Sequence, residues 1–272
     1  MRSRAVYEPC KRPEARITDC DSNSPLPGLT SNSYMVTPMR ILVIQHSDKE
    51  HAGGFRPLFS RDGHQVIACT APDEIGDADL NGIDGLWVLG GPMQVWEAGE
   101  LPWLSREIDL IREAVLVRRL PYFGICLGHQ LLAHVLGGEV APAEKSEVGL
   151  LHVSKRGNPP MFDGLSEEFG CFQWHSAEVS RLPRGSEITA SSARCNVQAM
   201  VWGGTAHSVQ FHAELDAATL ADWYEIEQCE EVLRNHIGSD ADRIFDDLAA
   251  AETTLARMRE NLYRHWFASF AR

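Results

Sequence analysis

The chain has 272 residues, of which 44% are hydrophobic and 23% charged, so it is long enough to bury one large core or two modest ones. Its apolar runs are all shorter than the roughly 18 residues that a membrane-spanning helix needs, which argues against a membrane protein and predicts a soluble one. The formal charge of −13 argues against nucleic-acid binding, which depends on Lys and Arg to neutralise phosphates.

Two features of composition bear on the surface and the redox environment. Between Glu214 and Arg272 there are 13 acidic and 6 basic residues, so about half of the negative excess falls in a C-terminal segment that we interpret as a helical surface. The 7 cysteines are irregularly spaced and form no CxxC pair. This predicts neither a disulfide framework nor a zinc knuckle, and favours buried thiols in a reducing cytoplasm.

Residues 1–38 are rich in proline and polar residues and show no apolar periodicity, which predicts a disordered N-terminal extension. No apolar core of a secretory signal is present in them. Four short apolar runs follow, at 41–44, 65–69, 85–89 and 122–125, and they are typical of strands buried on both faces. Helical spacing between the third and the fourth run, over 104–120, predicts a right-handed crossover and a parallel sheet.

The second half of the chain has a different pattern. Shorter strands, predicted at 149–154, 170–174, 197–202 and 206–211, suggest an antiparallel extension of the sheet. Helices are predicted over 217–237 and 240–271, the latter capped by Ser239 and Asp240. We expect one α/β domain over 39–272 that includes a C-terminal helical segment, 216–272.

Cys126 lies where a predicted strand runs directly into a predicted helix, flanked by Gly124 and Gly128. A turn this tight strains the central residue and leaves no room for side chains two positions away on either side. The pattern is the cysteine form of a nucleophile elbow. It predicts a Cys126 that is exposed above the sheet, with a thiolate stabilised by the positive end of the helix. The alternative is a buried structural cysteine.

A cysteine nucleophile needs a base, itself oriented by a third group. His212 and Glu214 follow the strand predicted at 206–211, and in an extended segment their side chains would point the same way. Gly90 and Gly91 follow another buried strand, so the backbone amide of Gly91 and that of Leu127 are candidate donors to an oxyanion. Taken alone, His-x-Glu is also compatible with a solvated strand end, and Gly-Gly-Pro with an ordinary turn.

Metal chemistry is not indicated. His129 and His134 are five residues apart on a predicted helix and therefore point to different faces, and no His-x-x-x-His pair has a suitably placed carboxylate. His175 is compatible with lining a pocket or with a structural role. The chemistry inferred for Cys126 requires neither a metal nor an organic cofactor.

Together these residues resemble the class I glutamine amidotransferases, a family with a Cys-His-Glu triad that includes the glutaminase domain of GMP synthase. The resemblance covers nearly all of residues 40–215. It rests on four motifs in family order: Gly90-Gly91-Pro92, Gly124-Ile-Cys-Leu-Gly-His-Gln130, Gln173-Trp-His-Ser176 and Val209-Gln-Phe-His-Ala-Glu214. Where many members have His-Pro-Glu, this chain has His-Ala-Glu, which loses a rigid turn but neither functional side chain.

The resemblance implies a flavodoxin-like parallel sheet flanked by helices, with a small antiparallel extension. It implies catalytic Cys126, His212 and Glu214, an oxyanion held by the backbones of Gly91 and Leu127, and Gln130 at the α-amino acid group of the substrate. Candidate residues of the glutamyl pocket are Met93, Trp174, Ser176 and Ala177.

Three functions agree with this. The first is a free-standing hydrolase that cleaves glutamine or a γ-glutamyl amine or peptide through a thioester. The second is a glutaminase subunit that supplies ammonia to a separate synthase, and the third a catalytically silent binding member, which the intact triad disfavours. About 58 residues follow Glu214, too few for a synthase domain, which favours the first. We expect a small-molecule γ-glutamyl substrate, no nucleic acid or membrane partner, and either a synthase partner or a homodimer.

Overall fold

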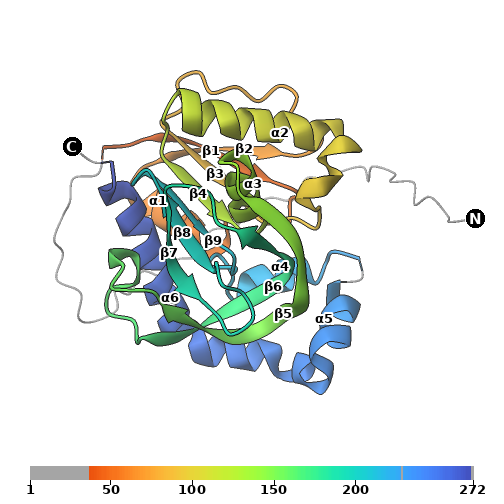
Figure 1. Ribbon diagram of the computed structural model, residues 1–272. Coiled ribbons are helices and arrows are strands. Elements are labelled where there is room, and N and C mark those ends of the chain that lie inside the picture. Colours follow the sequence, from red (N-terminus) through yellow and green to blue (C-terminus); the bar gives the residue numbers. More distant parts are fainter. Residues whose placement is uncertain (1–36, 228, 271–272) are drawn as a thin grey trace, which may run out of the picture. The chain divides into compact units, whose positions relative to one another are not determined.

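The computed structural model describes residues 37–227 and 229–270 (Figure 1). Apart from its last two residues, the extension predicted over 1–38 lies outside this range. No helix in the described part is both long enough and apolar enough to cross a lipid bilayer.

Among the described residues, nine strands form one sheet in the order β2-β1-β3-β4-β9-β8-β7-β5-β6. Five of them run parallel: β2 (Gln65–Thr70), β1 (Arg40–Gln45), β3 (Gly85–Val88), β4 (Tyr122–Ile125) and β9 (Ala206–Val209). Four are antiparallel to their neighbours: β8 (Ala199–Trp202), β7 (Ser186–Ser191), β5 (Glu139–Lys155) and β6 (Glu168–Arg181). The predicted α/β class with a mostly parallel central sheet is confirmed.

The parallel half follows the short apolar runs closely. The bounds of β1 to β4 differ from the predicted ones by one residue at most, and β1, β3 and β4 are almost completely buried. The expectation that all four runs are buried on both faces is wrong for β2, in which Cys69 is buried and three of the six residues are exposed, because β2 is an edge strand.

The antiparallel half contains the longest strands of the described chain. β5 has 17 residues and β6 has 14, where only 149–154 and 170–174 were predicted. β7 was not predicted, since its sequence Ser-Glu-Ile-Thr-Ala-Ser contains no apolar run.

The α-helices of the described residues are α1 (Arg56–Arg61), α2 (Pro102–Arg112), α3 (Leu127–Val135), α4 (Ala217–Trp223), α5 (Cys229–Ile237) and α6 (Ile244–Ala268). The helix predicted over 104–120 is α2 continued by a π-helical turn, Glu113–Val117. The single helix predicted over 217–237 is two helices. The predicted cap at Ser239 and Asp240 is wrong, because 238–243 form a 3-10 helix and α6 begins after Arg243 without a side-chain cap.

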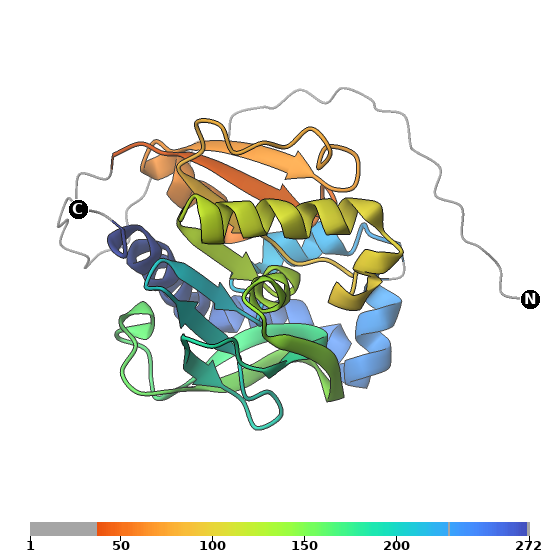
Figure 2. The same cartoon turned by 45° about the horizontal axis from the view of Figure 1, so that its top comes forward.

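The helices cover both faces of the sheet (Figures 1 and 2). α1 and α6 pack over one face, where Phe55, Phe59, Trp87 and Trp266 meet edge to face. α2 and α3 pack over the other face. The carboxyl ends of β1, β3 and β4 therefore open at one edge between two packed layers, where ligand sites of parallel sheets are found.

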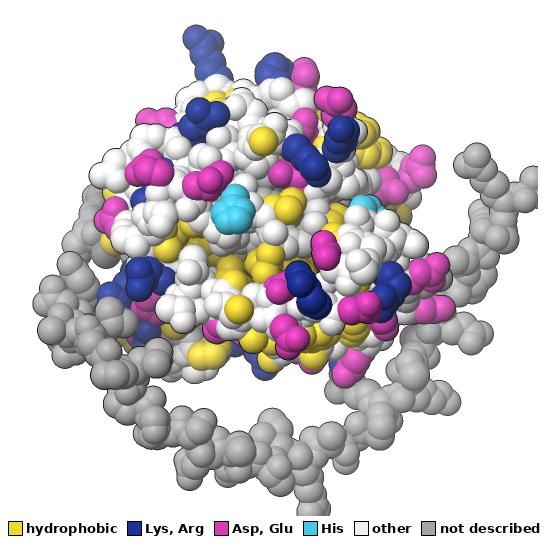
Figure 3. Space-filling view, turned by 90° about the horizontal axis from the view of Figure 1, so that it is seen from below, with side chains coloured by type: hydrophobic (Ala, Val, Ile, Leu, Met, Phe, Trp, Pro, Cys, Tyr) yellow, Lys and Arg dark blue, Asp and Glu magenta, His cyan; other side chains and the backbone are white. Residues whose placement is uncertain are grey.

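The acidic residues of the C-terminal helices are partly paired with bases. Arg234 contacts Glu230 at 3.2 Å and Asp242 at 2.7 Å. On the face shown in Figure 3, acidic and basic side chains are interspersed around an apolar band. Negative charge does not gather into one continuous patch on this face.

Candidate active site

Cys126 occupies the turn between β4 and α3. Its backbone is left-handed, with φ 51° and ψ −102°, a conformation that is costly for a residue with a side chain. The Cys126 amide donates to the Val209 carbonyl at 2.9 Å, and the Cys126 carbonyl accepts from the Gln130 amide at 3.1 Å. Bonds to β9 and α3 thus hold the strained residue, and the predicted strand-to-helix turn is confirmed.

The two flanking glycines are required by close approach of the backbone. A Cβ at Gly128 would lie 2.1 Å from the Val88 carbonyl oxygen, and one at Gly124 would lie 2.6 Å from the Gly128 carbonyl oxygen. Neither position accepts a side chain unless β3, β4 and α3 move apart. The packing reason given for these glycines from the sequence is therefore correct.

Cys126 is buried, whereas an exposed position was predicted. Its fractional exposure is 6%, and its Sγ lies 3.8 Å from the Trp174 carbonyl oxygen. The difference arises because β6 passes next to Cys126. The contacting residue of β6, Trp174, is 48 residues away from Cys126 in the sequence.

His212 and Glu214 form a buried pair after β9. His212 Nδ1 donates to Glu214 Oε1 at 2.7 Å, which leaves Nε2 as the ring nitrogen available to Cys126. The predicted contact is confirmed, but the reason given for it is wrong. β9 ends at Val209, and the pair meets across a turn in which the Leu215 amide approaches the His212 carbonyl at 3.4 Å.

The charge state of His212 is set by its neighbours. Burial lowers the pKa of His212, but the charges of Glu214 and Cys126 and the hydrogen bonds to both raise it well above its ordinary value of 6.5. The edge of Trp223 from α4 packs against the ring at a centroid distance of 4.9 Å. These neighbours stabilise a fixed imidazolium, the form that His212 has once it holds the proton of Cys126.

The turn that carries Glu214 is held by hydrogen bonds to three successive carbonyls. Arg259 of α6 donates from Nε to the Ala213 carbonyl at 3.1 Å and from Nη2 to the Leu215 carbonyl at 3.0 Å. The Glu214 carbonyl accepts from the Gly54 amide at 2.9 Å. Arg259 itself is only 5% exposed. Arg259 is not predicted from the sequence, because nothing near it in the chain marks it.

The predicted oxyanion donors lie next to this group. A Cβ at Gly90 would lie 2.8 Å from His212 Cε1 and 3.5 Å from Cys126 Cβ. Within the described part of the chain, the amides of Gly91 and Leu127 donate to no protein acceptor. Both N–H groups are free to bind a ligand atom near Cys126.

The predicted substrate segment 174–177 is held against α3. Gln130 Nε2 donates to the Ala177 carbonyl and to Gln210 Oε1, both at 3.1 Å. Trp174 is half-buried, Ser176 exposed and Ala177 buried. Met93 packs against the apolar core on the α2 and α3 side. The structure thus brings Trp174 next to Cys126, and Gln130 fixes the segment 174–177 to α3 through its bond to the Ala177 carbonyl.

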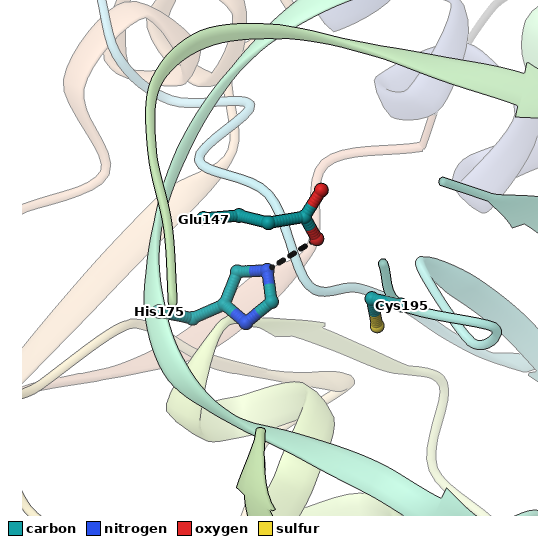
Figure 4. A group of neighbouring side chains, drawn as sticks. All are labelled: Glu147, His175 and Cys195. Carbon is teal, nitrogen blue, oxygen red and sulfur yellow. Dashed lines mark ion pairs between the residues drawn. The ribbon is translucent and has the colours of Figure 1, made fainter. Parts of the chain in front are cut away.

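Figure 4 shows a second group of Glu, His and Cys residues, which shares no residue with the group of Cys126, His212 and Glu214. Glu147, His175 and Cys195 are buried, and their ligand atoms lie within 4.8 Å of one another, which makes them the group with metal-ligand chemistry among the described residues. Glu147 Oε2 already accepts from Ser192 Oγ at 3.0 Å and Gln198 Nε2 at 2.8 Å. Burial raises the pKa of Cys195, which favours the neutral thiol over the thiolate that a metal binds. Glu147 Oε2 also lies 3.2 Å from His175 Nε2 as an ion pair, so this oxygen already has three protein partners.

The two helix histidines point to different faces, as predicted. His129 is buried between Ser208 Oγ at 2.8 Å and the Val197 carbonyl at 3.1 Å, and burial lowers its pKa to about 3. His134 is exposed.

Comparison with known proteins agrees with this geometry. The model of the family described as "Glutamine amidotransferase class-I" matches residues 60–225. A glutamine-hydrolysing GMP synthase subunit of Sulfurisphaera tokodaii is 42% identical over 127 residues, which cover 46% of this chain and 64% of that protein. The corresponding protein of Sulfolobus acidocaldarius is 38% identical over 154 residues, covering 56% of this chain and 78% of that protein. A solved glutamine amidotransferase of Thermotoga maritima has a TM-score of 0.76 and 29% identity, covering 85% of this chain and 99% of that chain.

The fold and the site define an α/β protein whose strained cysteine lies beside a buried His-Glu pair. Since the family model matches more than half of its length, the chain belongs to the class I glutamine amidotransferases. The aligned segment spans less than two thirds, 64%, of the Sulfurisphaera protein.

Proposed function

We propose that this protein hydrolyses the γ-amide bond of glutamine or of a γ-glutamyl amine through a γ-glutamyl thioester on Cys126. The observation that carries the proposal is the buried pair of His212 and Glu214, placed against Cys126 at a strained turn with two free amides beside it. Family membership and the glutamine-hydrolysing relatives support the same reaction.

The residues divide the reaction between them. His212 takes the Cys126 proton, and the thiolate attacks the γ-carbonyl carbon while the Gly91 and Leu127 amides bind the oxyanion. The intermediate collapses as His212 gives its proton to the leaving nitrogen, which releases ammonia or an amine. His212 then takes a proton from water, which attacks the thioester carbonyl, and glutamate leaves as the proton returns to the thiolate.

A second candidate is a glutaminase subunit that supplies ammonia to a separate synthase. The Sulfurisphaera and Sulfolobus relatives are themselves subunits of a GMP synthase, and this favours the second candidate. The free-standing hydrolase is supported by Trp223 and Arg259, through which the C-terminal helices form one wall of the site. We propose accordingly that residues 39–272 form one domain with the helical segment 216–272 as a part of it, acting in the cytoplasm.

The purified protein should be incubated with glutamine and with a panel of γ-glutamyl amines and peptides, and free glutamate followed. Turnover by the protein alone supports the free-standing hydrolase. Turnover that requires an added synthase partner supports the second candidate and refutes the first. Inactivity of the protein under both conditions contradicts both.

A further inference from the structure

Another buried histidine lies on the far side of the glycine loop (Gly90 and Gly91) from the nucleophile. His46 follows β1, Gly90 and Gly91 follow β3, and Cys126 follows β4. Because the order of these parallel strands is β1-β3-β4, the glycine loop lies between His46 and Cys126.

Both ring nitrogens of His46 face an acceptor. Nδ1 lies 2.6 Å from the Gly90 carbonyl oxygen, and Nε2 lies 3.2 Å from Glu107 Oε2 on α2. The side chains of His46 and Glu107 are 0% exposed. A ring protonated on both nitrogens donates to the Gly90 carbonyl and to the Glu107 carboxylate at the same time. In agreement, burial lowers the pKa of His46, but the charge and hydrogen bond of Glu107 and the Gly90 carbonyl raise it above 6.5.

The backbone of Leu89 is already held by hydrogen bonds, so the orientation of the following Gly90–Gly91 peptide depends on other contacts. The Leu89 amide donates to the Ile44 carbonyl at 3.0 Å, and the Leu89 carbonyl accepts from Gly128 at 3.2 Å, so the preceding residue is held on both sides. The Gly90–Gly91 peptide joins two glycines, which have little conformational preference of their own. The His46 ring packs against it so closely that a Cβ at Gly91 would lie 2.7 Å from His46 Cγ.

The direction of this peptide decides where the Gly91 amide points. In a trans peptide the C=O and the following N–H point in opposite directions. The Gly90 carbonyl points to His46, on the β1 side of the loop. The Gly91 N–H therefore points away from His46, toward the β4 side where Cys126 lies.

We propose that His46 and Glu107 are positioning residues that fix the Gly90–Gly91 peptide, so that the Gly91 N–H faces the oxyanion formed at Cys126. The inference rests on the proposed function, because it requires acyl transfer at that cysteine. His46 and Glu107 touch no reacting atom: Glu107 holds the imidazolium, and the imidazolium holds the carbonyl. Without them the glycine peptide can rotate, and the oxyanion loses one of its two donors.

The test measures kcat, KM and the rate at which iodoacetamide alkylates Cys126, a reaction that needs no oxyanion donor. His46→Ala should lower kcat about 10²-fold, the lower end of the effect of losing one oxyanion donor, while KM stays within about twofold and alkylation is unchanged. His46→Gln, which still carries a donor for the Gly90 carbonyl, should recover about tenfold of that loss. His207→Ala is the matched control, since His207 is also buried and bonded to a backbone carbonyl, that of Gly204 at 3.0 Å, near the start of β9.

A kcat of His46→Ala within about threefold of the wild type overturns the proposal, as does a parallel fall in alkylation. If His46→Ala does not fold, Glu107→Gln decides: a fall in kcat of about tenfold with unchanged alkylation supports the proposal, and an unchanged kcat overturns it. Failure of the proposed function is visible separately, because the wild type would then release no glutamate, or Cys126→Ala would release it as fast as the wild type.

Discussion

Replacement of Arg259 by methionine tests how the C-terminal helix supports the site. The change keeps much of the apolar stem but removes the hydrogen bonds to the two buried carbonyls on either side of Glu214, and a longer one of 3.3 Å to the partly exposed Glu252. Bonds from a charged donor contribute about 1.5–3 kcal/mol each, or about 3–6 kcal/mol for the two carbonyls together. Removal of a buried charge offsets part of this, so we expect a loss of about 3 kcal/mol in the free energy of unfolding. Because the turn that carries Glu214 loosens, kcat should also fall about tenfold or more.

Urea unfolding and glutamate release measure the two effects. Arg257→Met is the matched control, since Arg257 lies on the same helix but is exposed and makes one bond, to the Gly164 carbonyl at 3.2 Å. Arg259→Lys should fall between Arg259→Met and the wild type, because an ammonium does not reproduce the fork that reaches both carbonyls. The reasoning is refuted if Arg259→Met is no more harmful than Arg257→Met in either assay.

Three further changes probe the site and the core. Cys126→Ala should reduce turnover to background without lowering the melting temperature, and an active variant would refute the assignment of the nucleophile. Gly128→Ala places a Cβ 2.1 Å from the Val88 carbonyl oxygen and should fail to fold or lose several kcal/mol, whereas Gly170→Ala, with no atom within 4 Å, should be neutral in the same thermal melt. Burial lowers the pKa of His129 from 6.5 to about 3, so the folded state binds this proton less well than the unfolded state. The contribution of His129 to the free energy of unfolding is complete above pH 6.5 and is lost as the pH falls toward 3. The loss amounts to about 3 kcal/mol at about pH 4.5. The urea midpoint of the wild type should therefore fall with pH in this range, and that of His129→Asn should fall less.

The parallel half of the sheet was predictable because each of its strands is marked by a pattern of neighbouring residues in the sequence. Runs such as 41–44 and 122–125 are apolar throughout, and a strand between two helical layers needs just this pattern. β7 and the long ends of β5 and β6 were not predictable in the same way. Their residues are stabilised by pairing with strands distant in sequence, so they carry little apolar periodicity of their own.

The residues of the site divide in the same way, into those marked by a local motif and those brought together only by tertiary packing. Cys126, with its glycines, and His212, with Glu214, were found because each motif is short and local in the sequence. His46 and Glu107 are 61 residues apart and were missed, since their meeting depends on how α2 packs over the sheet. The position of His46 directly after a buried parallel strand would have marked it as a candidate. Arg259 had no comparable marker, because its partners lie 46 and 44 residues away.

The position of β6 has a consequence for how binding specificity can change. β6 is the last strand in the order of the sheet, and beyond it lie the His212 amide, bonded to the Phe172 carbonyl at 2.8 Å, and the sulfur of Cys126. An edge strand offers main-chain N–H and C=O groups to an incoming ligand, as in strand addition. A ligand held along 174–177 in this way is bound by atoms that every amino acid possesses. For the hydrolase that we propose, substitutions there can reshape the surroundings of the ligand while they leave its main-chain partners in place, so preference for a new leaving group can evolve without loss of the shared acyl portion.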